Sequence, residues 1–265
     1  MPHPYLELPC PLVIGHRGCA GEAPENTLIA FELGLERGAH ILESDVHLTR
    51  DGVPVLVHDA VVDRVTEGTG AVSDFDLHSL QELDAGHRFE TAAGHPYRGC
   101  GLSIPSLEEA LTRFSQARFN LELKADLPAI ISRSVDVVEA AGAGERVLLA
   151  AENDALMNAI HRELDARQVP AARGASASDV LGFLRAALDG KPPPPGPMAL
   201  QVPAEFRDRP LVTPEFVAHA HLHGLHVHVW TINDPVEMDR FLDLGVDGII
   251  TDHPALLAQR IAART

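Results

Sequence analysis

Acidic side chains interrupt two apolar runs of the sequence, where charged groups need a partner. Glu43 and Asp45 stand two positions apart in the run Ile41 to Leu48. Glu122 and Lys124 repeat this spacing at the end of a later run. Residues i and i+2 of a strand point to the same face, so each pair is expected to share one. Buried carboxylates are costly unless they are paired or bound to a cation.

Three acids and one base that converge from the ends of two neighbouring parallel strands would form a site of hard oxygen ligands. Mg²⁺ and Ca²⁺ prefer such ligands, with water or substrate oxygens completing the coordination. The alternative interpretation is a salt-bridged polar layer in the core, with Lys124 neutralising Glu122. The spacing alone leaves both interpretations open.

Two histidines follow apolar runs that are expected to be strands. His16 and Arg17 come at the end of the first run, and His58 ends the run that begins at Val53. Two imidazoles can serve as base and acid near neutral pH. The planar guanidinium of Arg17 suits a phosphate or a carboxylate. A structural role is the alternative for either histidine.

Five further histidines lie close together and resemble a metal-binding tract: His219, His221, His223, His226 and His228. The first three are expected on a helix that ends at Gly224, where only His219 and His223 share a face. The last two belong to the next strand, where His228 and Trp230 would share the inward face. We therefore interpret the tract as a solvated helix face and a packed barrel layer, with Trp230 as a candidate pocket wall or core aromatic.

Short apolar runs alternate with helical patterns along the chain, which is typical of βα units around a parallel sheet. The expected strands are Leu12 to His16, Ile41 to Leu48, Val53 to His58, Phe119 to Lys124, Arg146 to Ala151, Val169 to Arg173, Ala199 to Val202, Val227 to Ile232 and Gly248 to Thr251. About eight strand–helix units predict a (β/α)₈ TIM barrel of the α/β class. The main competitor, a doubly wound open sheet, lacks its G-x-G-x-x-G signature after the first strand.

Helix starts carry recognisable signals. Asn26 is the expected N-cap of the first helix, and Ser106 and Asp234 begin sequences that fit a capping box. Thr213 precedes a proline in the same way before another helix. The segment from Asp59 to Pro105 has only a short helical pattern, so we expect a small inserted subdomain there, over the barrel mouth.

Composition limits the possible partners. The 265 residues include 38 acidic and 21 basic side chains, a formal net charge of −17. Such a charge argues against a nucleic-acid or anionic-membrane partner. Three cysteines without paired metal spacing favour a reducing compartment. Met1 to Pro9 lack signal-peptide features, and no apolar stretch approaches the roughly 20 residues of a membrane span. We expect a cytoplasmic protein without stable membrane insertion.

Several motifs together have a familiar pattern. They are Gly15-His16-Arg17-Gly18, Pro24-Glu25-Asn26-Thr27, Glu43-Ser44-Asp45-Val46, Thr49-Arg50-Asp51-Gly52, Val57-His58-Asp59, Ile104-Pro105-Ser106-Leu107-Glu108-Glu109, Glu122-Leu123-Lys124, Trp230-Thr231-Ile232-Asn233 and Gly248-Ile249-Ile250-Thr251-Asp252. The chain closely resembles the glycerophosphodiester phosphodiesterase family over nearly its whole length. The resemblance implies one barrel domain over residues 1–265, with the inserted subdomain at about 59–105 after the second strand. It also implies hydrolysis of glycerophosphodiesters to glycerol 3-phosphate and an alcohol.

The resemblance also implies roles for individual residues. One divalent cation, Mg²⁺ or Ca²⁺, would be held by three carboxylates: Glu43, Asp45 and Glu122. His16 and His58 would be the acid–base pair. Arg17 and Lys124 would contact the phosphate of a small-molecule phosphodiester substrate, and Trp230 would line the glycerol side of the pocket.

Departures from the family pattern concern the leaving group. Ala151-Glu152-Asn153 stand where the family often has a Ser-Phe pair, and His47 stands where glutamine is frequent. Two other functions stay open: release of a head group from lysophospholipids, as in a lysophospholipase D, and a non-catalytic barrel that binds phosphorylated ligands. The sequence leaves open the oligomeric state, the head-group preference, the nucleophile and which histidine is the acid.

Overall fold

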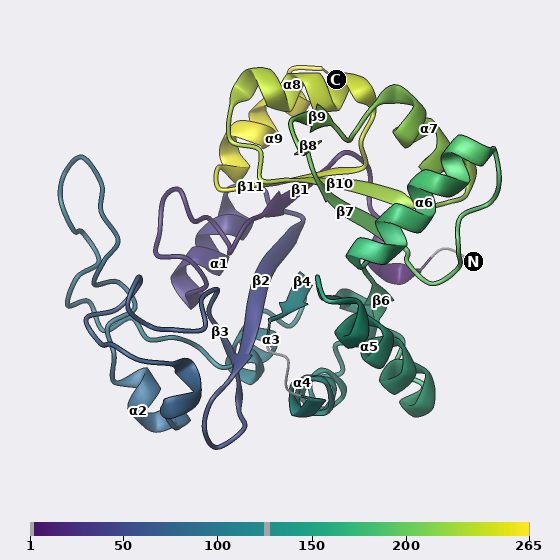
Figure 1. The fold of residues 1–265 in the computed structure, drawn as a ribbon. Helices are drawn as coiled ribbons and strands as arrows, with labels where there is room; N and C mark the ends of the chain where they lie inside the picture. The colour runs from purple at the N-terminus through teal and green to yellow at the C-terminus, as the bar shows by residue number, and fades with distance from the viewer. Residues whose placement is uncertain (1–2, 125–127, 265) are drawn as a thin grey trace.

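Eight parallel strands surround the core in the computed structural model, which describes residues 3–124 and 128–264. Their order in the sheet is β6-β5-β4-β2-β1-β11-β10-β7. Within the described residues these strands are β1 (Leu12–Gly15), β2 (Ile41–Leu48), β4 (Arg118–Leu123), β5 (Val147–Ala150), β6 (Ala172–Arg173), β7 (Ala199–Pro203), β10 (His226–Trp230) and β11 (Gly248–Thr251). Met198 N donates to Arg173 O at 2.9 Å across the seam between β6 and β7. The predicted (β/α)₈ barrel is confirmed (Figure 1).

Helices pack around this ring of strands. They are α1 (Leu28–Glu36), α3 (Leu107–Arg113), α4 (Pro128–Ala140), α5 (Asp154–Arg167), α6 (Ala177–Asp189), α7 (Pro214–Leu222), α8 (Pro235–Leu244) and α9 (Pro254–Ala262). Short 3₁₀ helices are η1 (Pro4–Leu6), η2 (Val72–Asp74) and η3 (Gly144–Arg146). A small two-stranded ribbon, β8 (Glu205–Phe206) and β9 (Arg209–Pro210), follows β7. No helix among the described residues combines the length and apolar character needed to cross a bilayer.

The helix-start signals are mostly confirmed. Ser106 forms the predicted capping box, and Thr213 accepts from the backbone of its helix. Asp234 accepts from two backbone N–H groups, so it is an N-cap. The predicted N-cap Asn26 is wrong, because Thr27 takes this place. Asn26 instead adopts a positive φ of 57° and turns its amide toward the barrel mouth.

The run predicted as a strand from Val53 to His58 is not part of the parallel ring. It forms β3 (Pro54–Leu56), which pairs antiparallel with β2 through Val46 and Leu56. The long strand β2 therefore extends beyond the ring of parallel strands, and β3 runs back along the end of β2. His58 reaches the mouth on this return and not at the end of a ring strand, as the sequence suggested.

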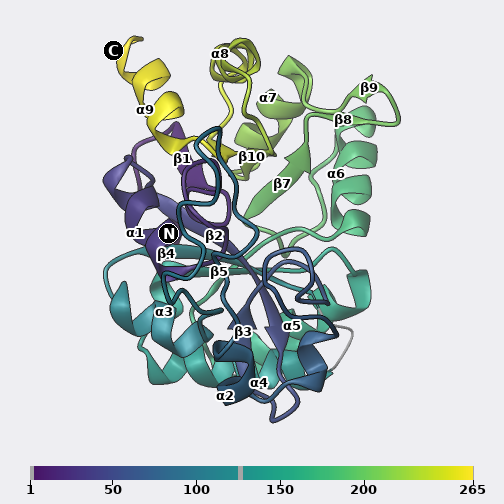
Figure 2. The same cartoon turned by 90° about the vertical axis from the view of Figure 1, so that its left-hand side faces the viewer.

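The segment after β3 has a hydrophobic cluster of its own and a short helix, α2 (Leu77–Gln81). The buried members of this cluster are Val55, Val57, Val62, Val72, Leu80, Ala85 and Ile104. Leu56 N donates to Pro105 O, which joins the two ends of the segment at β3. Figure 2 shows these loops in front of β1, β2 and β4.

The end of the barrel opposite the mouth is closed by the N-terminal segment. Tyr5 is fully buried and packs with Leu12, Ile14 and other side chains in the cluster that fills this end. On strand β10, His228 is also fully buried, and neither ring nitrogen has a hydrogen-bond partner in the described structure. Trp230, two residues further on, is 44% exposed.

His228 is expected to make the protein sensitive to acid. Burial and the neighbouring His226 lower the pKa of His228 to about 3, whereas an unfolded histidine has a value near 6.5. The unfolded state therefore binds the extra proton below about pH 6.5, and stability falls as the pH falls. At pH 5 the protonation of His228 in the unfolded state lowers the free energy of unfolding by about 2 kcal/mol.

We predict that His228→Leu reduces the loss of unfolding free energy between pH 7 and pH 5 by about this amount, as measured by urea unfolding in the presence of chelator. His78→Leu is the control, because the side chain of His78 on α2 is 90% exposed. Equal acid sensitivity in wild type and His228→Leu would contradict the prediction.

Candidate active site

Three carboxylates meet at the mouth of the barrel. Glu43 and Asp45 lie on β2, and Glu122 lies beside Asp45 on β4 in the parallel register. One carboxylate oxygen from each residue lies within 4.8 Å of the other two. The structure thus brings together the side chains that the sequence proposed as metal ligands.

Burial makes this cluster electrostatically unfavourable by itself. Glu43 is 6% exposed and Asp45 is 2% exposed. Burial and the neighbouring Asp45 carboxylate raise the pKa of Glu43 above its ordinary value. A divalent cation would stabilise both carboxylates in their charged form, and oxygen ligands suit Mg²⁺ or Ca²⁺. The donor set therefore fits a hard divalent cation.

Lys124 lies against the same cluster. Its Nζ atom is 3.2 Å from Asp45 Oδ1 and 2.8 Å from Glu122 Oε2. Burial lowers the pKa of Lys124, but these two carboxylates outweigh it and the net shift is upward. Lys124 is therefore a fixed positive charge at the mouth, and the salt-bridged arrangement considered from the sequence is present.

Arg17 is held over the cluster by the turn that follows β1. Its backbone N donates to Glu43 Oε2 at 2.9 Å, and its Nε lies 3.4 Å from Asp45 Oδ2. The turn depends on Gly18, which has a φ of +89° and leaves no room for a Cβ, because one would lie 2.6 Å from the backbone of Ala30. This close contact between the turn and α1 sets the position of Arg17.

Asn26 holds the Asp45 carboxylate, a role that the sequence interpretation missed. Its Nδ2 donates to Asp45 Oδ2 at 3.2 Å, and its Oδ1 accepts from Ser44 Oγ at 2.7 Å. The positive φ of Asn26 makes this orientation possible, and asparagine adopts such a φ more often than most other non-glycine residues. The Pro24-Glu25-Asn26-Thr27 motif of the family resemblance is the signal that could have indicated this role.

His16 is paired with Asp252, a carboxylate to which the sequence analysis assigned no role. His16 Nδ1 lies 2.6 Å from Asp252 Oδ1. Asn233 fixes the other oxygen, because its Nδ2 donates to Asp252 Oδ2 at 2.5 Å. The parallel pairing of Gly15 with Thr251 places both side chains just after the ends of β1 and β11. With Nδ1 engaged, Nε2 is the ring nitrogen left to exchange a proton with a ligand.

His58 has a comparable carboxylate partner. Its Nδ1 lies 2.7 Å from Asp59 Oδ1, and Arg64 Nε donates to Asp59 Oδ2 at 2.6 Å. Burial raises the pKa of Asp59, but Arg64 and His58 outweigh it and bring the pKa to about 2. Asp59 therefore stays ionised and orients the imidazole.

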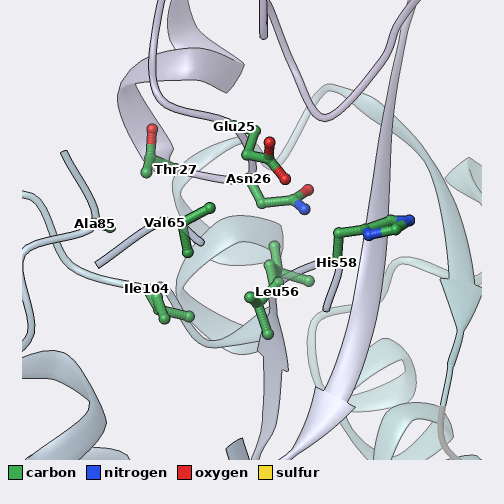
Figure 3. A pocket seen from close by; sticks show the side chains of 9 residues that line it. Glu25, Asn26, Thr27, Leu56, His58, Val65, Ala85 and Ile104 are labelled. Atoms are coloured by element: carbon green, nitrogen blue, oxygen red, sulfur yellow. The ribbon is translucent and has the colours of Figure 1, made fainter. Parts of the chain in front are cut away.

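Glu25 links the two sides of the mouth. It accepts from Arg64 at 2.6 Å and 2.8 Å, and from Arg17 at 2.8 Å. Figure 3 shows Glu25 and Asn26 above Leu56 and Ile104, around a cavity of about 10 Å³ between the turn after β1 and the inserted segment. The inserted segment, through Arg64, therefore contributes to the position of both Arg17 and His58.

A wider cleft opens beside Glu122 and Lys124. Its volume is about 670 Å³, and its lining includes Glu152 and Asp154 at the start of α5. Trp230 ends β10 at the same edge of the barrel, paired with Pro203. Glu152 stands at the departure from the family pattern noted above, so the departure lies at this cleft.

Comparisons with known proteins agree with this geometry. Residues 16–256 match the profile of the Glycerophosphoryl diester phosphodiesterase family. A glycerophosphodiester phosphodiesterase from Caldanaerobacter subterraneus is 33% identical, over 93% of this chain and 96% of the relative. A lysophospholipase D from Mus musculus is 27% identical, over 92% of this chain and 84% of the relative.

A solved structure has the same fold with a bound product. It is a phosphodiesterase from Oleispira antarctica in complex with sn-glycerol-3-phosphate, with a TM-score of 0.75 and 29% identity, covering 95% of this chain and 97% of that one. Fold and site together define a barrel enzyme with acidic residues and histidines at its mouth. The chain belongs to the glycerophosphoryl diester phosphodiesterase family, a family of phosphoric diester hydrolases.

The pairing of His16 with Asp252 leads to a testable prediction. Burial lowers the pKa of His16, but the bond to Asp252 and the charge of Glu43 outweigh it, so the pKa lies above the ordinary value of a histidine. Asp252→Asn removes one negative charge and is expected to lower this pKa, because the charged imidazole loses its partner.

Titration of the His16 ring protons by NMR measures this shift. Asp63→Asn is the matched control, because Asp63 is an exposed carboxylate of the inserted segment that accepts from Gly70 N. An unchanged His16 pKa in Asp252→Asn would show that the carboxylate does not stabilise the charged imidazole.

Proposed function

We propose that this protein hydrolyses glycerophosphodiesters to glycerol 3-phosphate and an alcohol, in a reaction that needs a divalent cation and two histidines. One observation carries the proposal: two histidines, each paired with a carboxylate, lie at the barrel mouth that holds the three-carboxylate cluster. The product bound to the related phosphodiesterase from Oleispira antarctica supports the same substrate class.

The cation would be Mg²⁺ or Ca²⁺, held by Glu43, Asp45 and Glu122. When bound, it draws charge from the non-bridging oxygens of the phosphodiester. Arg17 and Lys124 add positive charge on either side of Asp45, at 3.4 Å and 3.2 Å from its oxygens. We assign both to the phosphate, because charge develops on its oxygens as the P–O bond breaks.

His16 and His58 would move the protons. One imidazole takes a proton from the attacking hydroxyl group, which belongs to water or to the 2-hydroxyl of glycerol. The other donates a proton to the alcohol that leaves as the P–O bond breaks. Asp252 and Asp59 hold the two rings in place, and we assign Trp230 to the glycerol side of the pocket.

We further propose that residues 1–265 form one domain, with residues of about 59–105 as an inserted subdomain that carries Arg64 to the mouth. A cytoplasmic role in lipid and glycerol metabolism fits a small-molecule phosphodiester substrate. We propose no nucleic-acid partner, because the net charge of −17 disfavours one.

A second candidate is a lysophospholipase D activity that releases the head group of a lysophospholipid. The relative of that name from Mus musculus favours it. The exposed side chain of Trp230 at the mouth, 44% exposed, could contact an acyl chain. Comparing deacylated and lysophospholipid substrates separates the two activities.

We predict glycerol 3-phosphate release from glycerophosphodiesters after chelator treatment and resupply of Mg²⁺, Ca²⁺ or Mn²⁺. His16→Ala and His58→Ala should each reduce turnover by roughly 10²- to 10⁴-fold, because proton transfer is lost. Glu43→Ala should abolish both the activity and its response to the cation.

His78→Ala is the matched control, since this exposed histidine on α2 lies in the same inserted segment as Arg64. Circular dichroism would verify that all variants fold. Near-normal turnover in His58→Ala would refute its acid–base role, and activity that persists in chelator would refute the cation requirement.

A further inference from the structure

A second group of potential metal ligands lies at the end of the barrel opposite the mouth. Cys10 precedes β1, Asp247 precedes β11, and His226 begins β10. These three strands are neighbours in the sheet, so their N-terminal ends lie side by side. One ligand atom from each of the three residues lies within 4.8 Å of the other two.

The donor chemistry differs from that of the mouth. A thiol, an imidazole and one carboxylate replace three carboxylates. Sulfur and imidazole nitrogen favour Zn²⁺ and similar transition metals, whereas Mg²⁺ and Ca²⁺ favour oxygen alone. The two ends of one barrel would therefore select different cations.

The carboxylate of this group is already oriented. Asp247 Oδ2 accepts from Val227 N at 2.8 Å and lies 2.9 Å from His221 Nε2. Such support from behind is typical of residues that bind a metal through their other oxygen. Asp247 is thus held in place by contacts that do not use up all of its acceptor capacity.

His226 provides a second, independent observation. Its Nδ1 atom is buried and has no hydrogen-bond partner among residues 3–124 and 128–264. A buried polar atom without a partner is costly, and an unplaced ion is one of its recognised explanations. The Cys10 residue is exposed, so a cation can enter from solvent.

We propose that Cys10, His226 and Asp247 form a second metal site, which binds one zinc ion and leaves a fourth position to water. Cys10 binds as its thiolate, so its proton passes to solvent as the S–Zn bond forms. The ion would tie the N-terminal segment, with Tyr5 buried in the barrel, to strands β10 and β11. Its role is to stabilise this closed end, not to take part in hydrolysis.

Cobalt titration of the chelator-stripped full chain tests the site, because thiolate–Co²⁺ bonding gives near-ultraviolet absorption bands. An excess of Mg²⁺ keeps the mouth carboxylates occupied. We expect the bands in the wild type, their displacement by Zn²⁺, and a rise in Tm when Zn²⁺ is added. Cys10→Ser should lose the bands and weaken Zn²⁺ binding by about tenfold or more.

Cys100→Ser is the matched control, because Cys100 is also an exposed free thiol but lies in the inserted segment. This control should keep the bands and the Tm response. If Cys10→Ser fails to fold, His226→Gln replaces it as the test variant and should lose both. Absence of thiolate bands in the wild type, or their persistence in Cys10→Ser, would overturn the proposal. Hydrolysis is measured separately, so failure of the zinc site is distinguishable from failure of the proposed activity.

Discussion

The burial of two carboxylates side by side is the constraint around which the mouth is organised. Glu43 and Asp45 are almost removed from water and repel each other. Their neighbours act against this cost: a backbone N–H from the turn after β1, the Asn26 amide and the Lys124 ammonium. Removing one partner of such a network leaves a buried charge uncompensated, which is strongly destabilising. These contacts therefore offset part of the cost of burial, and the cation that we propose for this cluster would offset more of it.

The same constraint explains why the inserted segment matters. Arg64 joins Asp59 to Glu25, and Glu25 in turn contacts Arg17. One chain of salt bridges thus connects Asp59, the carboxylate that orients His58, with the guanidinium group of Arg17. Because these groups are partly buried, their interactions are screened less than those of surface ion pairs. Both histidines are held through Nδ1 by a carboxylate, one that follows the last strand and one in the segment after β3.

Much of this could be read from the sequence because it depends on local periodicity. The alternation of apolar runs with capped helices predicted the barrel, and the i, i+2 spacing of Glu43 and Asp45 predicted a shared face. Ser106 and Thr213 begin helices as their capping chemistry indicates. The sequence pattern could not reveal the direction of β3, because an antiparallel return and a ring strand have the same composition.

The fold class and the residues available for chemistry could be predicted from the sequence, since side-chain periodicity and residue type are local properties. The partners of these residues became visible only in the folded chain. Asp252 lies beside His16, 236 residues away in the sequence, because β1 and β11 are neighbours in the sheet. Asn26 does not cap the helix, and its amide donates instead to the buried carboxylate of Asp45. Cys10, His226 and Asp247 converge because three strands begin at one end of the barrel. Such contacts join residues that are far apart in the sequence, so a local sequence pattern cannot predict them.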